Sequence, residues 1–142
     1  MEIKPFGIEY YDAMIELWKI SGIPYKIKGR DSKEEIERQM NADRELFIGA
    51  FEGKRLVGVV IASHDRRKGW INRLAVLPEF RGRGIGKNLI SSAESVLRKR
   101  GMKVICTLIE DDNEISLRLF QECGYTLHRD IFYLSKREGD EF

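Results

Sequence analysis

A glycine-rich stretch, PEFRGRGIGKNLI at residues 78–90, separates two kinds of hydrophobic pattern and constrains the fold most. Before it, residues 70–77 form a largely apolar run with β-branched side chains, which predicts a strand. After it, apolar residues recur at helical spacing until Gly101, which is typical of a helix end. That apolar stripe consists of Leu89, Ile90, Ala93, Val96 and Leu97. The stretch therefore predicts a strand-to-helix junction, with the helix covering about residues 84–100.

Similar patterns predict the other elements. We expect strands at residues 3–6, 46–51, 56–62, 70–77, 104–109 and 125–134. Three further helices begin near Tyr11, after Ser32 in a capping box with Glu35, and after Asn113. The continuous apolar run 104–109 predicts a strand that is buried on both faces.

The connections between these elements predict their arrangement. Short loops join the three strands of residues 46–77, so they are expected to form an antiparallel meander. A helix joins residues 70–77 to 104–109, which predicts two parallel neighbours with a right-handed crossover. We therefore expect an α/β (α+β) fold with a mixed, mostly antiparallel central sheet of about six to seven strands, flanked by about four helices.

Composition limits the class of protein. The 142 residues are the size of one domain, expected to span residues 1–142 with a frayed tail from about residue 136. There are 25 Lys and Arg against 23 Asp and Glu, so a net charge of +2 gives no global reason to bind nucleic acid. Cys106 and Cys123 form no CxxC pair, which favours a reducing, cytoplasmic location. The longest apolar stretch is about a third of a membrane span, so no membrane partner is expected.

The three glycines of the stretch can create an anion site. Gly82, Gly84 and Gly86 lie where the first-turn N–H groups of a helix have no intrahelical partner. Glycine permits positive φ and removes Cβ, so several N–H groups can converge on one phosphate. Arg81, Arg83 and Lys87 add positive charge. A plain strand-to-helix turn is the alternative, although three glycines cost chain entropy that such a turn does not require.

The sequence motifs of two better-known phosphate-binding loops do not match this stretch. A P-loop requires GxxxxGK[ST], whereas GRGIGKN has one residue too few and Asn88 in place of the hydroxyl that binds magnesium. A dinucleotide fingerprint requires GxGxxG early in a parallel sheet, but here GxGxG follows a meander. The sequence therefore disfavours both a P-loop NTPase and a dinucleotide-binding domain.

What remains is R-x-x-G-x-G at residues 81–86, preceded by LAVLPEF and followed by NEISLRLFQECGY at residues 113–125. These two segments, in this order and separation, resemble the signature of the GCN5-related N-acetyltransferase (GNAT) superfamily, and the element order matches nearly the whole chain. The resemblance implies a GNAT-like acyl-CoA N-acyltransferase fold and an enzyme that transfers acetyl from acetyl-CoA to a primary amine. It implies acetyl-CoA as cosubstrate. His64 and His128 show no metal-ligand spacing, so no metal is expected.

The resemblance also implies which residues contact acetyl-CoA. Residues 81–87 receive the pyrophosphate, the strand residues 74–76 offer backbone groups to the pantetheine arm, and one asparagine and one aromatic residue complete the set. The predicted residues are Leu74, Ala75, Val76, Arg81, Gly82, Arg83, Gly84, Ile85, Gly86, Lys87, Asn113 and Phe120. Asn113 reads equally well as a simple N-cap, and Phe120 as a core residue.

Phe120 changes the expected chemistry. The family often has a tyrosine there that protonates the departing thiolate, and a phenyl ring has no proton to give. Tyr133 is the candidate acid, although a packing role is more common for such a residue. Glu110 is the candidate base, although it lies in the acidic run EDDNE and carboxylates of such runs are more often solvated. Water is the alternative for both roles.

The acceptor is left open by the sequence. In this superfamily the segment near residues 20–30 shapes the acceptor site, and SGIPYKIKGR is basic with one aromatic, Tyr25. Asn72 is the other candidate substrate contact; it and Arg73 are expected on opposite faces of their strand. The basic segment near residues 20–30 indicates an acceptor with negative charge near its amine. A non-catalytic acyl-CoA-binding or sensing module is the alternative function, and a homodimer is expected from exposed final strands.

Overall fold

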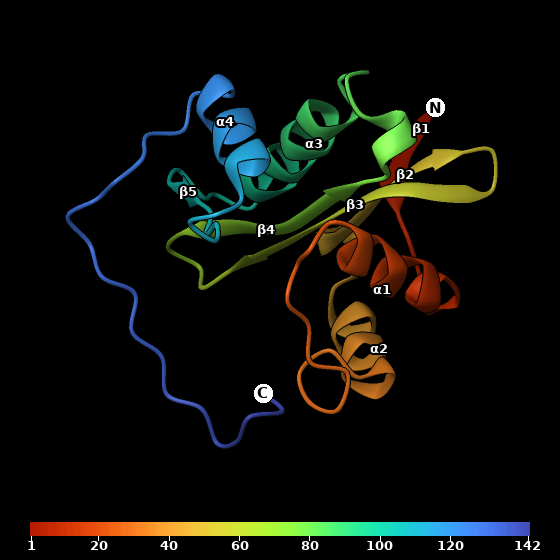
Figure 1. The fold of residues 1–142 in the computed structure, drawn as a ribbon, viewed down its shortest axis with the longest axis horizontal. Helices are drawn as coiled ribbons and strands as arrows, with labels where there is room; N and C mark the ends of the chain where they lie inside the picture. The colour runs from red at the N-terminus through yellow and green to blue at the C-terminus, as the bar shows by residue number, and fades with distance from the viewer.

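A mixed five-stranded sheet in the order β1-β2-β3-β4-β5 organises the fold in the computed structural model, which describes residues 1–142 (Figure 1). The strands are β1 (Glu2–Pro5), β2 (Phe47–Glu52), β3 (Arg55–His64), β4 (Gly69–Val76) and β5 (Ile105–Cys106). Successive strands from β1 to β4 pair antiparallel, and β5 pairs parallel with β4. The predicted meander, and the parallel pair that follows from its crossover helix, are confirmed.

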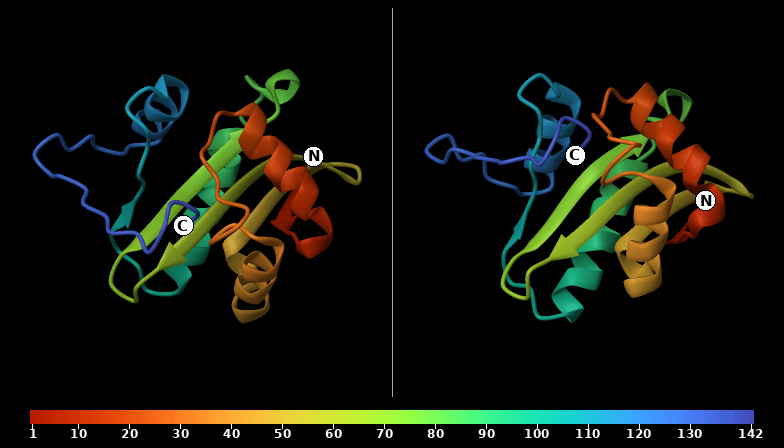
Figure 2. Two further views of the ribbon diagram at one scale, coloured as in Figure 1. Left: turned by 60° about the horizontal axis from the view of Figure 1, so that its bottom comes forward. Right: turned by 90° about the horizontal axis from the view of Figure 1, so that it is seen from below.

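Four helices cover the two faces of this sheet (Figures 1 and 2). α3 (Ile85–Lys99) and α4 (Glu114–Glu122) lie on one face, and α1 (Tyr11–Ile20) and α2 (Lys33–Ala42) lie on the other. Short 3-10 turns at Ile8–Tyr10, Arg44–Leu46 and Pro78–Phe80 complete the regular structure. No helix combines the length and the apolar character needed to span a bilayer.

The helices form where the apolar spacing predicts them. Ser32 caps α2 by accepting the Glu35 N–H at 3.2 Å, as the capping box requires. In α3, four members of the apolar stripe are buried against the sheet. On the opposite face, Trp18 of α1 is fully buried, so both layers share one continuous core with the sheet between them.

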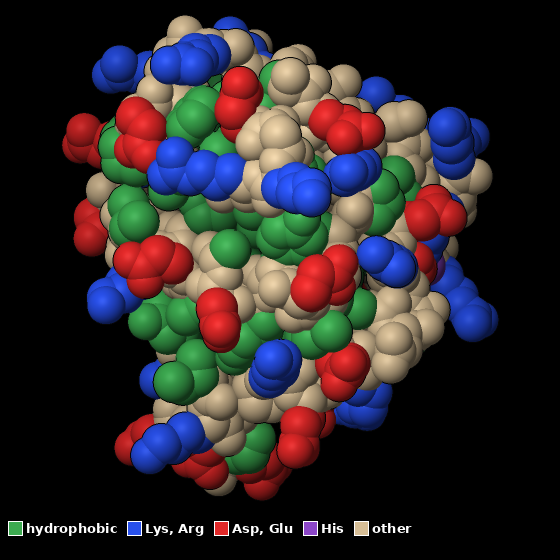
Figure 3. Space-filling model, turned by 90° about the vertical axis from the view of Figure 1, so that its right-hand side faces the viewer, with side chains coloured by type: hydrophobic (Ala, Val, Ile, Leu, Met, Phe, Trp, Pro, Cys, Tyr) green, Lys and Arg blue, Asp and Glu red, His purple; other side chains and the backbone are tan.

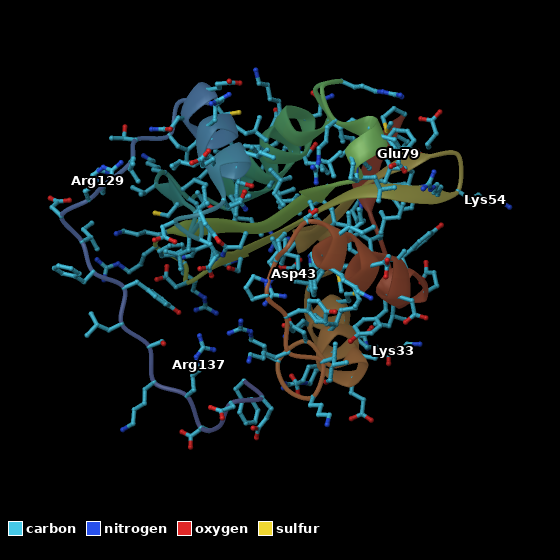
Figure 4. The ribbon with its side chains drawn as sticks, in the orientation of Figure 1. Lys33, Asp43, Lys54, Glu79, Arg129 and Arg137 are labelled. Atoms are coloured by element: carbon cyan, nitrogen blue, oxygen red, sulfur yellow. The ribbon has the colours of Figure 1, made fainter.

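One predicted strand is much shorter than expected, and another is absent. The run 104–109 pairs with β4 only at Ile105 and Cys106, and Val104 and Leu108 are 50% and 52% exposed rather than buried on both faces. Residues 125–134 form no strand, because no partner strand lies beside them; the segment runs outside the layers, where Arg129 and Arg137 can be followed in Figure 4. The sheet therefore has five strands rather than six to seven.

Candidate active site

The loop between β4 and α3 has the backbone that its glycines predict. Gly82 and Gly84 have φ of +78° and +80°, in the left-handed region that other residues rarely adopt. Gly84 is the N-cap of α3 and provides no side-chain cap, so the first-turn N–H groups are left to a ligand or solvent. A Cβ added at either glycine would meet no atom within 4 Å, so the space beside this backbone is open.

Neighbouring side chains hold the loop in place. Arg81 Nε donates to the Val76 carbonyl at 3.0 Å, which ties the loop to the end of β4. Glu79 (labelled in Figure 4) pairs with Arg55 of β3 at 3.1 Å. The Arg83 guanidinium lies 4.9 Å from the Phe80 ring centroid. The loop is therefore fixed by contacts on both sides of its glycines.

A cavity of about 720 Å³ lies between this loop, the end of β4 and α4. Ten of the twelve residues predicted to contact acetyl-CoA line it: Leu74, Ala75, Val76, Arg81, Gly82, Gly84, Ile85, Gly86, Lys87 and Asn113. Arg83 does not line it and packs on Phe80 instead. Lys87 Nζ lies 3.2 Å from Oε2 of Glu122, which also lines the cavity, so the carboxylate partly neutralises the charge of Lys87. We call this space the donor cavity.

A second cavity, of about 480 Å³, lies between the segment after α1, the middle of β4 and residues 107–113. Asn72, Glu110, Tyr133 and Phe120 line it, whereas Tyr25 does not and packs against Trp18. Phe120 is 3% exposed and stacks edge-to-face on Tyr125, with ring centroids 5.1 Å apart. We call this space the acceptor cavity.

The two cavities meet. Ser21, Leu74, Asn113 and Ser116 line both of them, so a ligand in one can touch a ligand in the other at the end of α1 and the start of α4. Asn113 Oδ1 accepts the Ser116 N–H at 3.2 Å and is therefore the N-cap of α4. Ser21, which the sequence reasoning missed, has a buried hydroxyl with no hydrogen-bond partner at this junction.

A β-bulge in β4 shapes the acceptor cavity. Asn72 pairs with Ile61 and Ala75 with Val59, so two β4 residues oppose one residue of β3. One of the two, Arg73, has a φ of +59°. The bulge breaks the alternation of side chains along the strand, so Asn72 and Arg73 both line the cavity and the prediction of opposite faces is wrong. Asn72 Oδ1 accepts the Leu108 N–H at 3.1 Å, which holds the chain after β5 near the bulge.

Arg73 lies in a largely buried ion pair that the sequence reasoning did not find. Its Nη1 is 3.0 Å from Asp31 Oδ1, and its guanidinium lies 4.4 Å from the Trp18 ring centroid. Burial lowers the pKa of Arg73, and the Asp31 carboxylate opposes that shift. Asp31 is 5% exposed and also accepts the Lys26 N–H at 2.7 Å. This pair fixes the segment after α1 against β4.

The remaining predicted side chains are more exposed. Glu110 and Tyr133 lie at the cavity wall, Tyr133 with 69% of its surface exposed. Neither Glu110 nor Asp112 forms an ion pair in residues 1–142.

On the face shown in Figure 3, acidic and basic side chains are interspersed, so that face has no continuous basic surface for a polyanion.

Comparison with known proteins identifies the family. The sequence profile of the Acetyltransferase (GNAT) family matches residues 11–125, and the chain belongs to this family. The resemblance found in the two sequence segments is confirmed.

Solved structures share the fold. Ard1 from Thermoplasma volcanium aligns with a TM-score of 0.78 at 20% identity, over 89% of this chain and 83% of that one. The PaiA N-acetyltransferase from Thermoplasma acidophilum, in complex with coenzyme A, aligns with a TM-score of 0.74 at 24% identity. The alignment covers 89% of this chain and 90% of that one. An aminoglycoside antibiotic 6'-N-acetyltransferase from Acinetobacter haemolyticus aligns with a TM-score of 0.70 at 20% identity. The alignment covers 98% of this chain and 100% of that one. These likenesses show a common fold across named proteins of different kinds.

Proposed function

We propose that the chain is an acetyl-CoA-dependent N-acetyltransferase that transfers acetyl directly to a primary amine. The observation that carries the proposal is the junction of the two cavities, which lets a donor and an acceptor meet at Leu74 and Asn113. Membership of the acetyltransferase family and the coenzyme A complex of the PaiA enzyme support it.

The donor cavity fits a pyrophosphate and an extended thioester arm. The first-turn N–H groups of α3 and the left-handed backbone at Gly82 and Gly84 present donors to an anion, and the helix dipole adds favourable potential. Lys87 and Arg81 supply positive charge at its wall. Residues 74–76 of β4 would lie along the arm, and acetyl-CoA would supply the activated acetyl group at the junction.

In the acceptor cavity, the proposed step requires a neutral amine. Glu110 takes a proton from the acceptor ammonium, directly or through water, and the amine nitrogen then bonds to the acetyl carbon and releases its second proton to solvent. The carbon–sulfur bond breaks, and the thiolate receives a proton from Tyr133 or from solvent. Phe120 has no proton to give, and its ring packs against Tyr125.

The test measures binding and transfer separately. Wild-type protein is mixed with acetyl-CoA and a panel of amines, and acetylated amine is measured by mass spectrometry while free thiol is measured by a colorimetric reagent. Glu110→Gln and Tyr133→Phe are expected to retain acetyl-CoA binding, and Glu110→Gln to lower transfer by about 100-fold. Unchanged transfer in both variants would remove these two residues from the proposed mechanism.

A second candidate function is an acyl-CoA sensor of the same fold. The substitution at Phe120, buried and without a hydroxyl, is the observation that favours it. Saturable acetyl-CoA binding with no transfer to any amine would select the sensor. Transfer above the uncatalysed rate would reject it.

Three broader predictions about the protein go with this proposal. We propose that residues 1–142 act as one domain, that the protein works in the cytoplasm, and that it forms a homodimer. Two free cysteines agree with the second of these, and an unpaired β5 edge agrees with the third.

A further inference from the structure

The acceptor cavity has walls of opposite charge. Arg30 and Arg73 line one side, which the segment after α1 and the β4 bulge form. Glu110 and Asp112 line the other side, which the segment after β5 forms. A ligand in this space therefore meets guanidinium groups at one end and carboxylates at the other.

The basic side keeps a net positive charge. Asp31 is the only carboxylate that pairs with either arginine, and it neutralises one of the two charges. Arg73 takes the closer contact, at 3.0 Å, and its side chain is 16% exposed. Arg30 Nε is 3.7 Å from Asp31, beyond hydrogen-bond distance, and its side chain is 46% exposed. The Arg30 guanidinium therefore has free donors for an anionic ligand.

The acidic side keeps its charge as well. Glu110 and Asp112 form no ion pair within residues 1–142, and both side chains are exposed. Two carboxylates without a cation attract an ammonium group, and their place next to Asn113 puts that ammonium near the junction with the donor cavity. The amine end of a ligand thus faces the donor, and the anionic end faces Arg30.

We propose that the acceptor is a small zwitterionic amine, one that carries a carboxylate on the same molecule, as an amino acid does. This inference rests on the proposed function and names its substrate class. A cavity of about 480 Å³ suits a small molecule. A polyamine is disfavoured because its second cation would lie against the arginines. Acetylation removes the ammonium charge, so the anionic product loses its attraction to Glu110 and Asp112 and is released.

The test uses matched pairs of acceptors. The probes are ω-amino carboxylates of increasing length from glycine upward, the corresponding amides, which lack the negative charge, and spermidine. Binding of each probe is measured by calorimetry in the presence of saturating coenzyme A, and transfer is measured by mass spectrometry with acetyl-CoA. We expect at least one carboxylate to bind about 10- to 100-fold more tightly than its amide and to be acetylated faster by a similar factor.

Two variants distinguish a direct contact between Arg30 and the ligand's carboxylate from a general effect of positive charge in the segment after α1. Arg30→Gln should abolish the preference for the carboxylate over its amide and leave acetyl-CoA binding unchanged. Lys28→Gln removes the same charge from the same segment, but Lys28 does not line the cavity, so the preference should remain.

The results test the zwitterion proposal and the acetyltransferase function separately. Equal binding and transfer for carboxylates and amides, or a preference for spermidine, would overturn the zwitterion proposal while the acetyltransferase function stands. An equal loss of preference in both variants would also overturn it. Carboxylate binding that is preferred and lost in Arg30→Gln, without any transfer, would support the cavity assignment and count against the enzyme.

Discussion

At the residue scale, the donor cavity depends on the left-handed backbone of Gly84. Gly84→Ala should lower the free energy of unfolding by about 1 kcal/mol, because a Cβ at a φ of +80° strains the backbone. The new methyl group would meet no protein atom within 4 Å, so it would project into the space proposed for the pyrophosphate. We therefore expect acetyl-CoA to bind at least 10-fold more weakly, as measured by calorimetry.

Gly53→Ala is the matched control for this change. Gly53 lies in the turn between β2 and β3, with a φ of +60° and open space around its Cβ position. The control should lose a similar stability in urea denaturation and keep full affinity for acetyl-CoA. Equal loss of affinity in both variants would show that the effect on binding comes from stability alone.

Residue patterns predicted the lining of the donor cavity better than that of the acceptor cavity. Glycine tolerates the left-handed region that other residues rarely adopt, so Gly82 and Gly84 ahead of α3 predict the conformation of the loop. Arg73 gives no such signal, because a positive φ at arginine depends on the register of β3 and β4. Asp31 also gave no signal: an acid at the end of a basic segment reads as solvated, and only the fold brings Arg73 and Trp18 to it.

At the element scale, an ion pair joins the ends of helices from opposite faces of the sheet. Asp43 (labelled in Figure 4) follows α2, and Arg100, the C-cap of α3, donates hydrogen bonds to both of its carboxylate oxygens, with Nη2 2.8 Å from Oδ1. These hydrogen bonds hold the pKa of Asp43 below its usual value. The side chains are 26% and 31% exposed, so we expect a contribution of about 1 kcal/mol.

This contribution should depend on pH in a defined direction. Because the pKa of Asp43 is lower in the folded chain, its stabilisation is complete above the unfolded pKa of about 3.9 and is lost as pH falls through the folded value. Asp43→Asn should therefore be less stable than wild type at neutral pH, and the difference should shrink below about pH 4. Urea denaturation over that range measures it. A difference that is constant with pH would contradict the role of the carboxylate.

The helices and the strands of the meander were predicted, whereas the two strands nearest the C-terminus were not, because each needed a partner that the fold does not supply along its whole length. The apolar stripe of α3 and the capping box of α2 are local signals, and both gave the right helix. Residues 104–109 and 125–134 carry strand-like side chains, but a strand also requires a neighbour to receive its hydrogen bonds. β4 offers β5 only two paired positions, and the final segment has no neighbour.

At the scale of the whole molecule, the fold brings three distant segments to one junction. The end of α1, the end of β4 and the start of α4 supply Ser21, Leu74 and Asn113, and these line both cavities. Their convergence follows from the sheet order and could not be predicted from any one segment. Family membership explains why the loop between β4 and α3 could be recognised from its motif, whereas the charged residues that line the acceptor cavity come together only in the folded chain.

Calorimetric titration of the wild-type protein with acetyl-CoA tests the central claim most directly. The account predicts saturable binding at one site per chain. It also predicts that ligand at 100 times its Kd stabilises the folded state by about 2.7 kcal/mol, which raises the Tm by about 5–10 °C. No heat of binding, together with an unchanged Tm at millimolar acetyl-CoA, would contradict the account.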